Sequence, residues 1–136
     1  MANLRYLIVA VIVFGGTARA DEKLNCDDST NMNQSQMNMC WYQEFAKADA
    51  ALNEIWPEVK VFAKSLDQDA SEGDQTGADA LLKSQRAWLV YREQQCALES
   101  FTSRGGSMQP MLNTGCKTAL TNARVSELKN FISPDN

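Results

Sequence analysis

Residues 37 to 66 repeat their apolar side chains every three or four positions. The series comprises Met37, Trp41, Phe45, Ala48, Leu52, Ile55, Val59, Phe62 and Leu66. This spacing places them on one face of a long amphipathic helix. Asn33 is the predicted N-cap, and Gln36, three residues later, completes a capping-box pattern. Pro57 interrupts the series, so we expect the helix to kink or split there.

Two more helices are predicted further along the chain. Residues 67–79 carry five acids, two glycines and no base, which is typical of a linker. The second helix should run from about Asp79 to Phe101, and the third should end near Phe131. Between them, Gly105 and Gly106 can end one helix and Ser107 can cap the next, with Pro110 in its first turn.

Each of these helices also has an expected buried face. On the second helix it comprises Leu81, Gln85, Trp88, Leu89, Arg92 and Cys96. On the third it comprises Leu112, Cys116, Ala119, Leu120, Ala123 and Phe131. The sequence has no strand pattern and no repeat, so the predicted fold is an all-α, antiparallel domain of about three long helices.

The first twenty residues have the pattern of a secretory signal peptide. Arg5 precedes an apolar run from Tyr6 to Phe14, and Ala18-Arg19-Ala20 is a small-x-small cleavage pattern. The run is shorter than the roughly 20 apolar residues of a membrane-spanning helix. We therefore expect cleavage after Ala20 and a single mature domain, residues 21–136, in the periplasm or secreted. Cys26 lies too far from this site to be a lipid-anchor cysteine, so no membrane association is expected after cleavage.

Four cysteines lie in the predicted mature region: Cys26, Cys40, Cys96 and Cys116. An even number in an exported chain indicates two disulfides, for which three pairings are possible. A zinc site of four thiolates is disfavoured because the C-x2-C spacing and histidine are absent. The methionine-rich stretch NMNQSQMNMC suggests copper, but Met37 and Met39 would project about 200° apart around a helix. We predict neither a metal nor a cofactor.

The charge of the chain bears on its partners. The whole sequence has 13 basic and 17 acidic residues, and removal of Arg5 and Arg19 would leave a net charge of −6. Nucleic acid is therefore not an expected partner, whereas a cationic protein is. Without histidine, the chain has no histidine-based catalytic triad and no imidazole base, and no nucleotide-binding motif is present. We do not expect an enzyme.

Arg92 lies near the centre of the expected apolar face of the second helix. A buried arginine requires a carboxylate partner because an unpaired buried charge is very costly. On the first helix, Glu44 falls inside the apolar stripe and Asp49 on its flank. We therefore predict a cross-helix ion pair between Arg92 and either Glu44 or Asp49. Its expected role is structural, and the alternative is a ligand site.

Three strings together resemble the N-terminal domain of the LprI-type lysozyme-inhibitor family: MNMC-WYQEFAKADAALN, SQRAWLVYREQQC and GGSMQPMLNTGC. They lie between Cys26 and about Phe131. Trp56-Pro57 departs from the family pattern, which more often has an aromatic residue within an unbroken helix, and the lipidation site of the family's namesake is missing. The resemblance implies an exported helical protein that binds and inhibits a lysozyme. The alternative is a periplasmic interaction module with another envelope protein as partner.

Two surfaces are candidates for contact with a partner. The first is the acidic linker, with Asp67, Asp69, Glu72, Asp74 and Asp79, although it is also explained as a solvated connection. The second is the turn of Arg104, Gly105, Gly106 and Ser107, where helix ending alone accounts for the glycines.

For the cysteines, we predict the two local pairings. Cys26 precedes the first helix and Cys40 lies in its second turn, while Cys96 and Cys116 flank the turn between the second and third helices. Each bond would close a short loop and contribute about 3 kcal/mol in the chain-entropy description.

Overall fold

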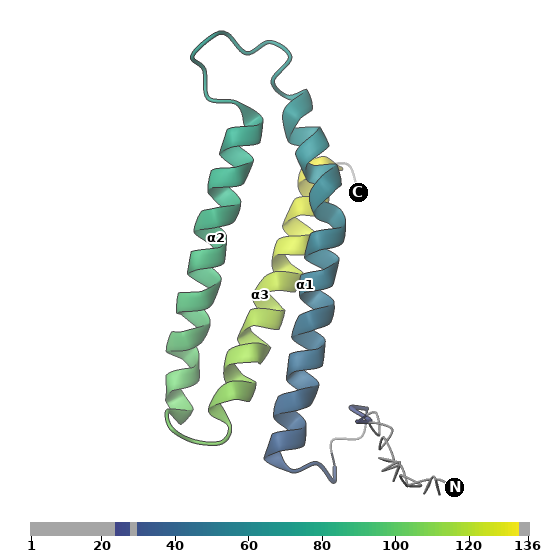
Figure 1. Cartoon of the computed structure of the whole chain (residues 1–136), viewed down its shortest axis with the longest axis vertical. Helices are drawn as coiled ribbons and strands as arrows, with labels where there is room; N and C mark the ends of the chain where they lie inside the picture. Colours follow the sequence, from purple (N-terminus) through teal and green to yellow (C-terminus); the bar gives the residue numbers. More distant parts are fainter. Residues whose placement is uncertain (1–23, 28–29, 134–136) are drawn as a thin grey trace, which may run out of the picture.

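The computed structural model describes residues 24–27 and 30–133. Three long helices follow one another: α1 (Gln34–Ser65), α2 (Gly77–Ser100) and α3 (Gln109–Ile132), with one short 3-10 turn, η1 (Phe101–Ser103), after α2. Consecutive helices are antiparallel, so α1 and α3 run in the same direction and pack closely along their lengths, whereas α2 packs mainly on α3 (Figure 1). The described residues contain no strand, and the predicted all-α class is confirmed.

The start of α1 is as predicted. The Asn33 side chain accepts a hydrogen bond from the Gln36 amide at 3.0 Å, and the Gln36 side chain accepts one from the Asn33 amide at 2.9 Å. This reciprocal pair satisfies two backbone donors that a helix start leaves free.

Pro57 does not split α1, contrary to one of the two outcomes expected for it. The helix is continuous through this residue. Pro57 and Asn53, whose carbonyl loses its helical partner, are both exposed, so water can replace the missing hydrogen bond. Ile55 and Val59 on either side of Pro57 are buried in the core and hold both parts of the helix in place.

The ends of the other helices differ from expectation in one respect. Thr76 caps α2 by accepting from the Asp79 amide at 3.1 Å, and Pro110 lies in the first turn of α3 as predicted. Ser107 does not cap α3, because Met108 occupies the N-cap position without a side-chain bond. The Ser107 carbonyl instead accepts from the Asn38 side chain at 3.0 Å, which ties the turn to α1.

The apolar core occupies the half of the bundle next to the acidic linker. Its members are Leu52, Ile55, Val59, Ala63, Leu81, Val125 and Leu128. Full burial of one large aliphatic side chain contributes about 1.5–3 kcal/mol, so this cluster is a principal source of stability. The Phe62 and Phe131 rings pack edge to face beside the core, with 5.1 Å between their centroids.

The buried face of α3 was predicted incorrectly. Ala119, Ala123 and Phe131 are exposed, and the buried positions are Thr114, Thr118, Thr121, Val125 and Leu128. Thr114 and Thr118 donate their hydroxyl protons to the carbonyls of Pro110 and Thr114, each at 2.8 Å, within the same helix. A threonine satisfied in this way presents its methyl group to a neighbouring helix and can be buried at little cost.

Both predicted disulfides are confirmed. Cys26 is bonded to Cys40 and Cys96 to Cys116, with Cα–Cα separations of 5.6 and 5.4 Å. The first ties the segment before α1 to its second turn, and the second joins α2 to α3. Both lie in the half of the bundle away from the apolar core.

Candidate functional site

Arg92 lies at the centre of the polar half of the bundle. Its residue is 7% exposed. The guanidinium donates to the carboxylates of Glu93 and Asp49, at 3.1 and 3.4 Å, and to the Thr121 hydroxyl at 3.1 Å. These contacts join all three helices through one side chain.

The Arg92 guanidinium is also enclosed by aromatic rings. The Phe45 and Trp88 ring centroids each lie 5.1 Å from its central carbon. The Phe45 ring centroid also lies 6.0 Å from the Lys117 ammonium, and the Trp88 ring centroid lies 5.9 Å from the Arg124 guanidinium. Three cations therefore contact two rings at the interface of the helices. We call these five residues the cation–aromatic row; each of its contacts is favourable because a ring face attracts positive charge.

Glu93 is held in its ionised form by this row. Partial burial acts to raise its pKa, but hydrogen bonds and charge attraction from Lys117 and Arg92 together outweigh burial and lower the pKa below its ordinary value. Asp49 and Glu93 have side chains 43% and 44% exposed, so water screens both ion pairs. The row acts as a clamp between helices, and each of its three cations already has an acceptor within the protein.

The structure separates the two carboxylates proposed as partners of Arg92. Asp49 contacts it, whereas Glu44 pairs with Lys47 on the same helix. Lys47 has a raised pKa from this hydrogen bond and charge attraction. The expected pair with Glu44 is therefore absent from the described residues.

The acidic linker of residues 67–79, called the acidic loop below, lies at one end of the bundle; its residues up to Thr76 form a loop, whereas residues 77–79 are the first turn of α2. The Asp67 side chain accepts from the Gly77 amide, and the Asp74 side chain accepts from the Ser71 amide at 2.9 Å. A Cβ on Gly77 would lie 2.5 Å from the Ala63 carbonyl oxygen, so only glycine allows this close approach. Two of the five linker acids thus shape the loop, and the remaining three, Asp69, Glu72 and Asp79, are exposed.

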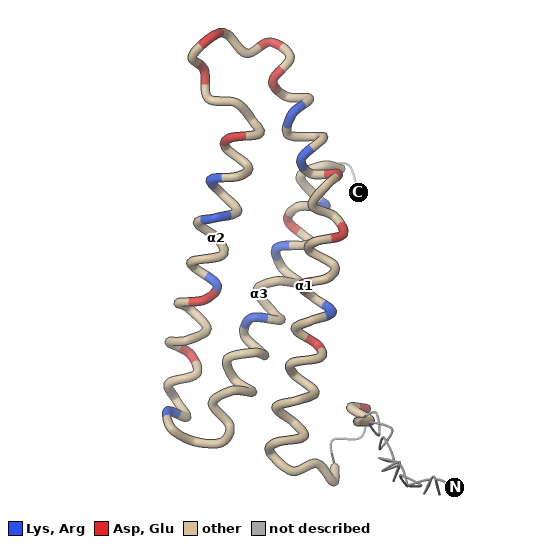
Figure 2. Tube along the Cα trace, viewed as in Figure 1, with Lys and Arg blue, Asp and Glu red and all other residues tan. Residues whose placement is uncertain are grey.

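The turn of residues 104–107 lies at the opposite end of the bundle (Figures 1 and 2). All four of its residues are exposed, and Gly105 has a φ of 76°, which favours glycine. The two candidate contact surfaces are therefore not brought together.

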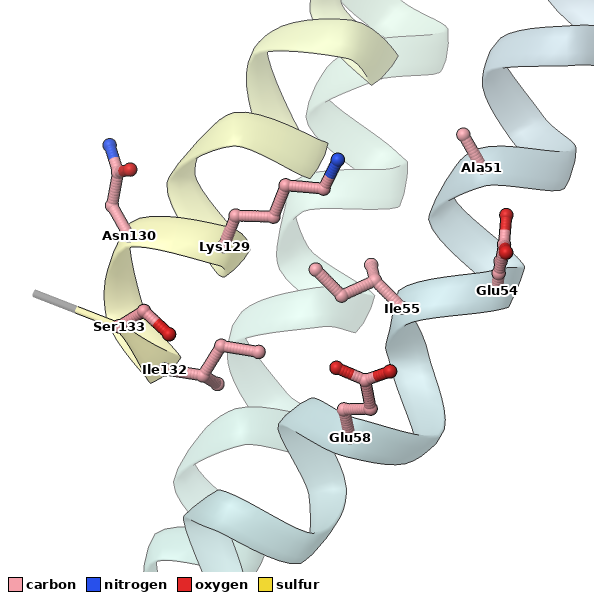
Figure 3. A pocket seen from close by; sticks show the side chains of 8 residues that line it. All are labelled: Ala51, Glu54, Ile55, Glu58, Lys129, Asn130, Ile132 and Ser133. Atoms are coloured by element: carbon pink, nitrogen blue, oxygen red, sulfur yellow. The ribbon is translucent and has the colours of Figure 1, made fainter. Parts of the chain in front are cut away.

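A pocket of about 540 Å³ lies between α1 and the end of α3 (Figure 3). Ile55 and Ile132 form part of its apolar wall, and Glu54, Glu58 and Lys129 surround it with charge. All three charged residues are exposed. No group of three or more histidine, cysteine or acidic residues suited to hold a metal is found in the described part of the chain.

Sequence reasoning missed Lys117, Thr121 and Arg124 as members of the polar interior. Their spacing on α3, with steps of four and three residues, is the signal that marks a shared helix face. In the sequence, such three- and four-residue steps were used to predict a helix face only for apolar residues.

The predicted signal peptide, residues 1–20, lies outside the described residues. Among the described helices, none combines the length and hydropathy needed to cross a bilayer.

Comparison with known proteins identifies relatives of the chain. The family model described as lysozyme inhibitor LprI matches residues 26–128. The uncharacterized protein R02472 of Rhizobium meliloti (strain 1021) is 40% identical over 104 residues, which cover 74% of this chain and 75% of that protein. The uncharacterized protein YecT of Escherichia coli (strain K12) is 33% identical over 75 residues, or 54% of this chain and 45% of YecT.

No solved structure matches the chain. The matched residues 26–128 begin at the first disulfide cysteine and end at the core residue Leu128, so they include both disulfides and the cation–aromatic row. The chain belongs to the lysozyme inhibitor LprI family.

Proposed function

We propose that this chain is an exported binding protein that inhibits a lysozyme. The observation that carries this proposal is the match of a lysozyme-inhibitor family model to residues 26–128. The two disulfides agree with an oxidising compartment such as the periplasm or the extracellular space. Residues 1–20 serve as the signal peptide in this proposal, and residues 21–136 form the mature domain.

The charge of the protein supports a cationic partner. The full chain has a formal net charge of −4, and the proposed mature form has −6. Opposite net charges accelerate encounter between two proteins, and salt reduces this effect. A binding role rather than catalysis also agrees with the enclosed Arg92 centre, where neighbouring side chains occupy the polar groups.

The test is muramidase activity on cell walls with the mature, disulfide-bonded protein in molar excess. Chicken-type and goose-type lysozymes are assayed separately at low and physiological salt. We expect loss of activity with at least one type, with a stronger effect at low salt. Full activity of both types at low salt would contradict inhibition, and the protein would then be an envelope interaction module with a different partner.

A further inference from the structure

The end of the bundle that contains the turn of residues 104–107 is almost free of charge. Residues 31–43, which lead into and begin α1, have no charged side chain, and Arg104 is the only charged residue in 100–116. We call this surface the turn end. Figure 2 shows the contrast with the opposite end, where acidic residues line the loop between α1 and α2. The turn end therefore presents one cation, Arg104, on a largely neutral surface, and the exposed Glu99 in the last turn of α2 is its nearest charged neighbour in sequence.

Arg104 is available to a partner. It is exposed, and no carboxylate among the described residues lies within ion-pairing distance of it, unlike Arg92 and Arg124. Its guanidinium lies over the Phe101 ring at 4.8 Å from the centroid. The ring orients the guanidinium by cation–π attraction and leaves its N–H donors free for an acceptor.

The turn that carries Arg104 is held rigidly. The Gly105 amide donates to the Gln109 side chain and the Gly106 amide to the Ser103 carbonyl, each at 2.9 Å. The Asn38 side chain bonds the Ser107 carbonyl from α1. The Cys96–Cys116 disulfide joins the helices on either side. A rigid turn loses little conformational entropy when it binds, which favours affinity.

Apolar and aromatic groups surround the arginine. Tyr42 and Phe101 are 52% and 47% exposed, and both line a shallow pocket of about 450 Å³ beside Gly105 and Gly106. Met108 is exposed nearby in sequence. Interfaces are enriched in Tyr, Phe, Met and Arg and depleted in Lys, Asp and Glu at their centres. The turn end has this composition, and the acidic loop does not.

We propose that the turn end enters the substrate cleft of the muramidase and that Arg104 pairs there with the catalytic carboxylates. This inference rests on the proposed function. Glycosidases of this class have two carboxyl groups at the scissile bond, and a guanidinium matches a carboxylate with two parallel hydrogen bonds. The acidic loop is separated from the turn by the length of α2, roughly 36 Å for its 24 residues. At physiological salt the Debye length is about 8 Å, so the loop does not guide docking at the turn.

The first experiment compares Arg104→Ala with Lys83→Ala. Both variants remove one exposed positive charge from the α2 side of the bundle, but Lys83 lies in the half near the acidic loop. We expect Arg104→Ala to raise the inhibition constant about 30-fold or more and Lys83→Ala to change it less than about 2-fold. Unchanged melting temperatures confirm that both variants fold. Arg104→Lys, which keeps the charge but not the planar fork, should lie between them.

A second variant tests the acidic loop under the same conditions. Asp69, Glu72 and Asp79 are replaced together by their amides, which leaves the loop-shaping Asp67 and Asp74 intact. We expect slower association at low salt and nearly unchanged inhibition at physiological salt. If these replacements abolish inhibition while Arg104→Ala does not, the loop is the contact surface and our assignment is wrong.

Direct pairing is tested by calorimetric binding to a muramidase whose two catalytic carboxylates are replaced by amides. The wild-type chain should bind this enzyme at least 10-fold more weakly than the unmodified enzyme, and Arg104→Ala should bind both enzymes alike. Equal binding of the wild-type chain to both enzymes would contradict the pairing.

The outcomes separate this inference from the proposed function. If the wild-type chain inhibits and Arg104→Ala inhibits equally well, the function stands and the turn-end assignment is wrong. If the wild-type chain inhibits neither lysozyme type, both are wrong. Light scattering of the wild-type chain and of Arg104→Ala tests whether the turn end instead binds a second copy of this chain. A wild-type dimer that Arg104→Ala dissociates would show that it does, and would also overturn the inference.

Discussion

The two halves of the bundle are stabilised by different means. The half next to the acidic loop has a continuous aliphatic core built from all three helices. The other half buries Arg92, Ser100 and three threonines, and both disulfides lie there. A polar interior gains less from the hydrophobic effect, and a covalent link compensates by restricting the unfolded chain. The comparison teaches that disulfides in this small domain are placed where apolar burial is weakest.

The largest expected effect tests the apolar half. Leu128→Ala should lower the free energy of unfolding by about 3–4 kcal/mol, because it removes transfer free energy and leaves a cavity beside Val59 and Val125. The matched control is Thr118→Ala in the polar half, for which we expect about 1 kcal/mol. Urea unfolding measures both. Equal losses for the two variants would show that the halves do not differ in packing.

Removal of the Cys96–Cys116 disulfide tests the other half. The double variant Cys96→Ala/Cys116→Ala should lose about 3 kcal/mol, since the bond closes a loop with a sequence separation of 20. Amide hydrogen exchange should show the loss mainly near residues 92–116, with the apolar core still protected. If protection falls equally in the core, the two halves unfold as one unit.

Arg92→Met tests the cation–aromatic row. We expect a loss of about 2 kcal/mol, below the roughly 3 kcal/mol typical when a buried carboxylate loses its partner, because Asp49 and Glu93 are partly exposed. Muramidase inhibition per folded molecule should be unchanged. A variant with normal melting and lost inhibition would instead make Arg92 a contact residue.

The smallest effect concerns the pH dependence that Glu93 contributes. Its pKa is lower in the folded protein than its ordinary value of 4.5. The stability it adds is therefore complete above that value and is lost as pH falls through the lower folded pKa. Glu93→Gln should flatten the acid limb of a stability-versus-pH curve by on the order of 0.5 kcal/mol, because the side chain is partly exposed. Glu72→Gln is the control, because Glu72 is exposed in the loop between α1 and α2, away from the row. An identical acid limb in wild type and Glu93→Gln would contradict this role.

The candidate binding surfaces were found from sequence only as separate segments. The acidic residues of 67–79 and the Arg104–Ser107 turn are visible in the sequence because charge runs and glycines are local features. Their separation to opposite ends follows from the antiparallel course of α1 and α2. The neutral surface around Arg104 arises only when Tyr42 from α1 is brought beside Phe101 and Gly105.

Local chemistry along the chain determined the helices, the α1 cap and the disulfide pairing. Capping and apolar periodicity act over a few residues, and a cysteine close in sequence is an easy partner. The tertiary structure decided which side of α3 is buried and that Arg92 contacts Asp49 rather than Glu44. Threonine is polar on any hydropathy scale, yet once its hydroxyl bonds to its own helix it packs as a small apolar group. Whether a threonine of α3 acts as an exposed polar residue or as a buried apolar one depends on how α3 is rotated about its own axis relative to α1 and α2. That rotation depends on side chains from all three helices.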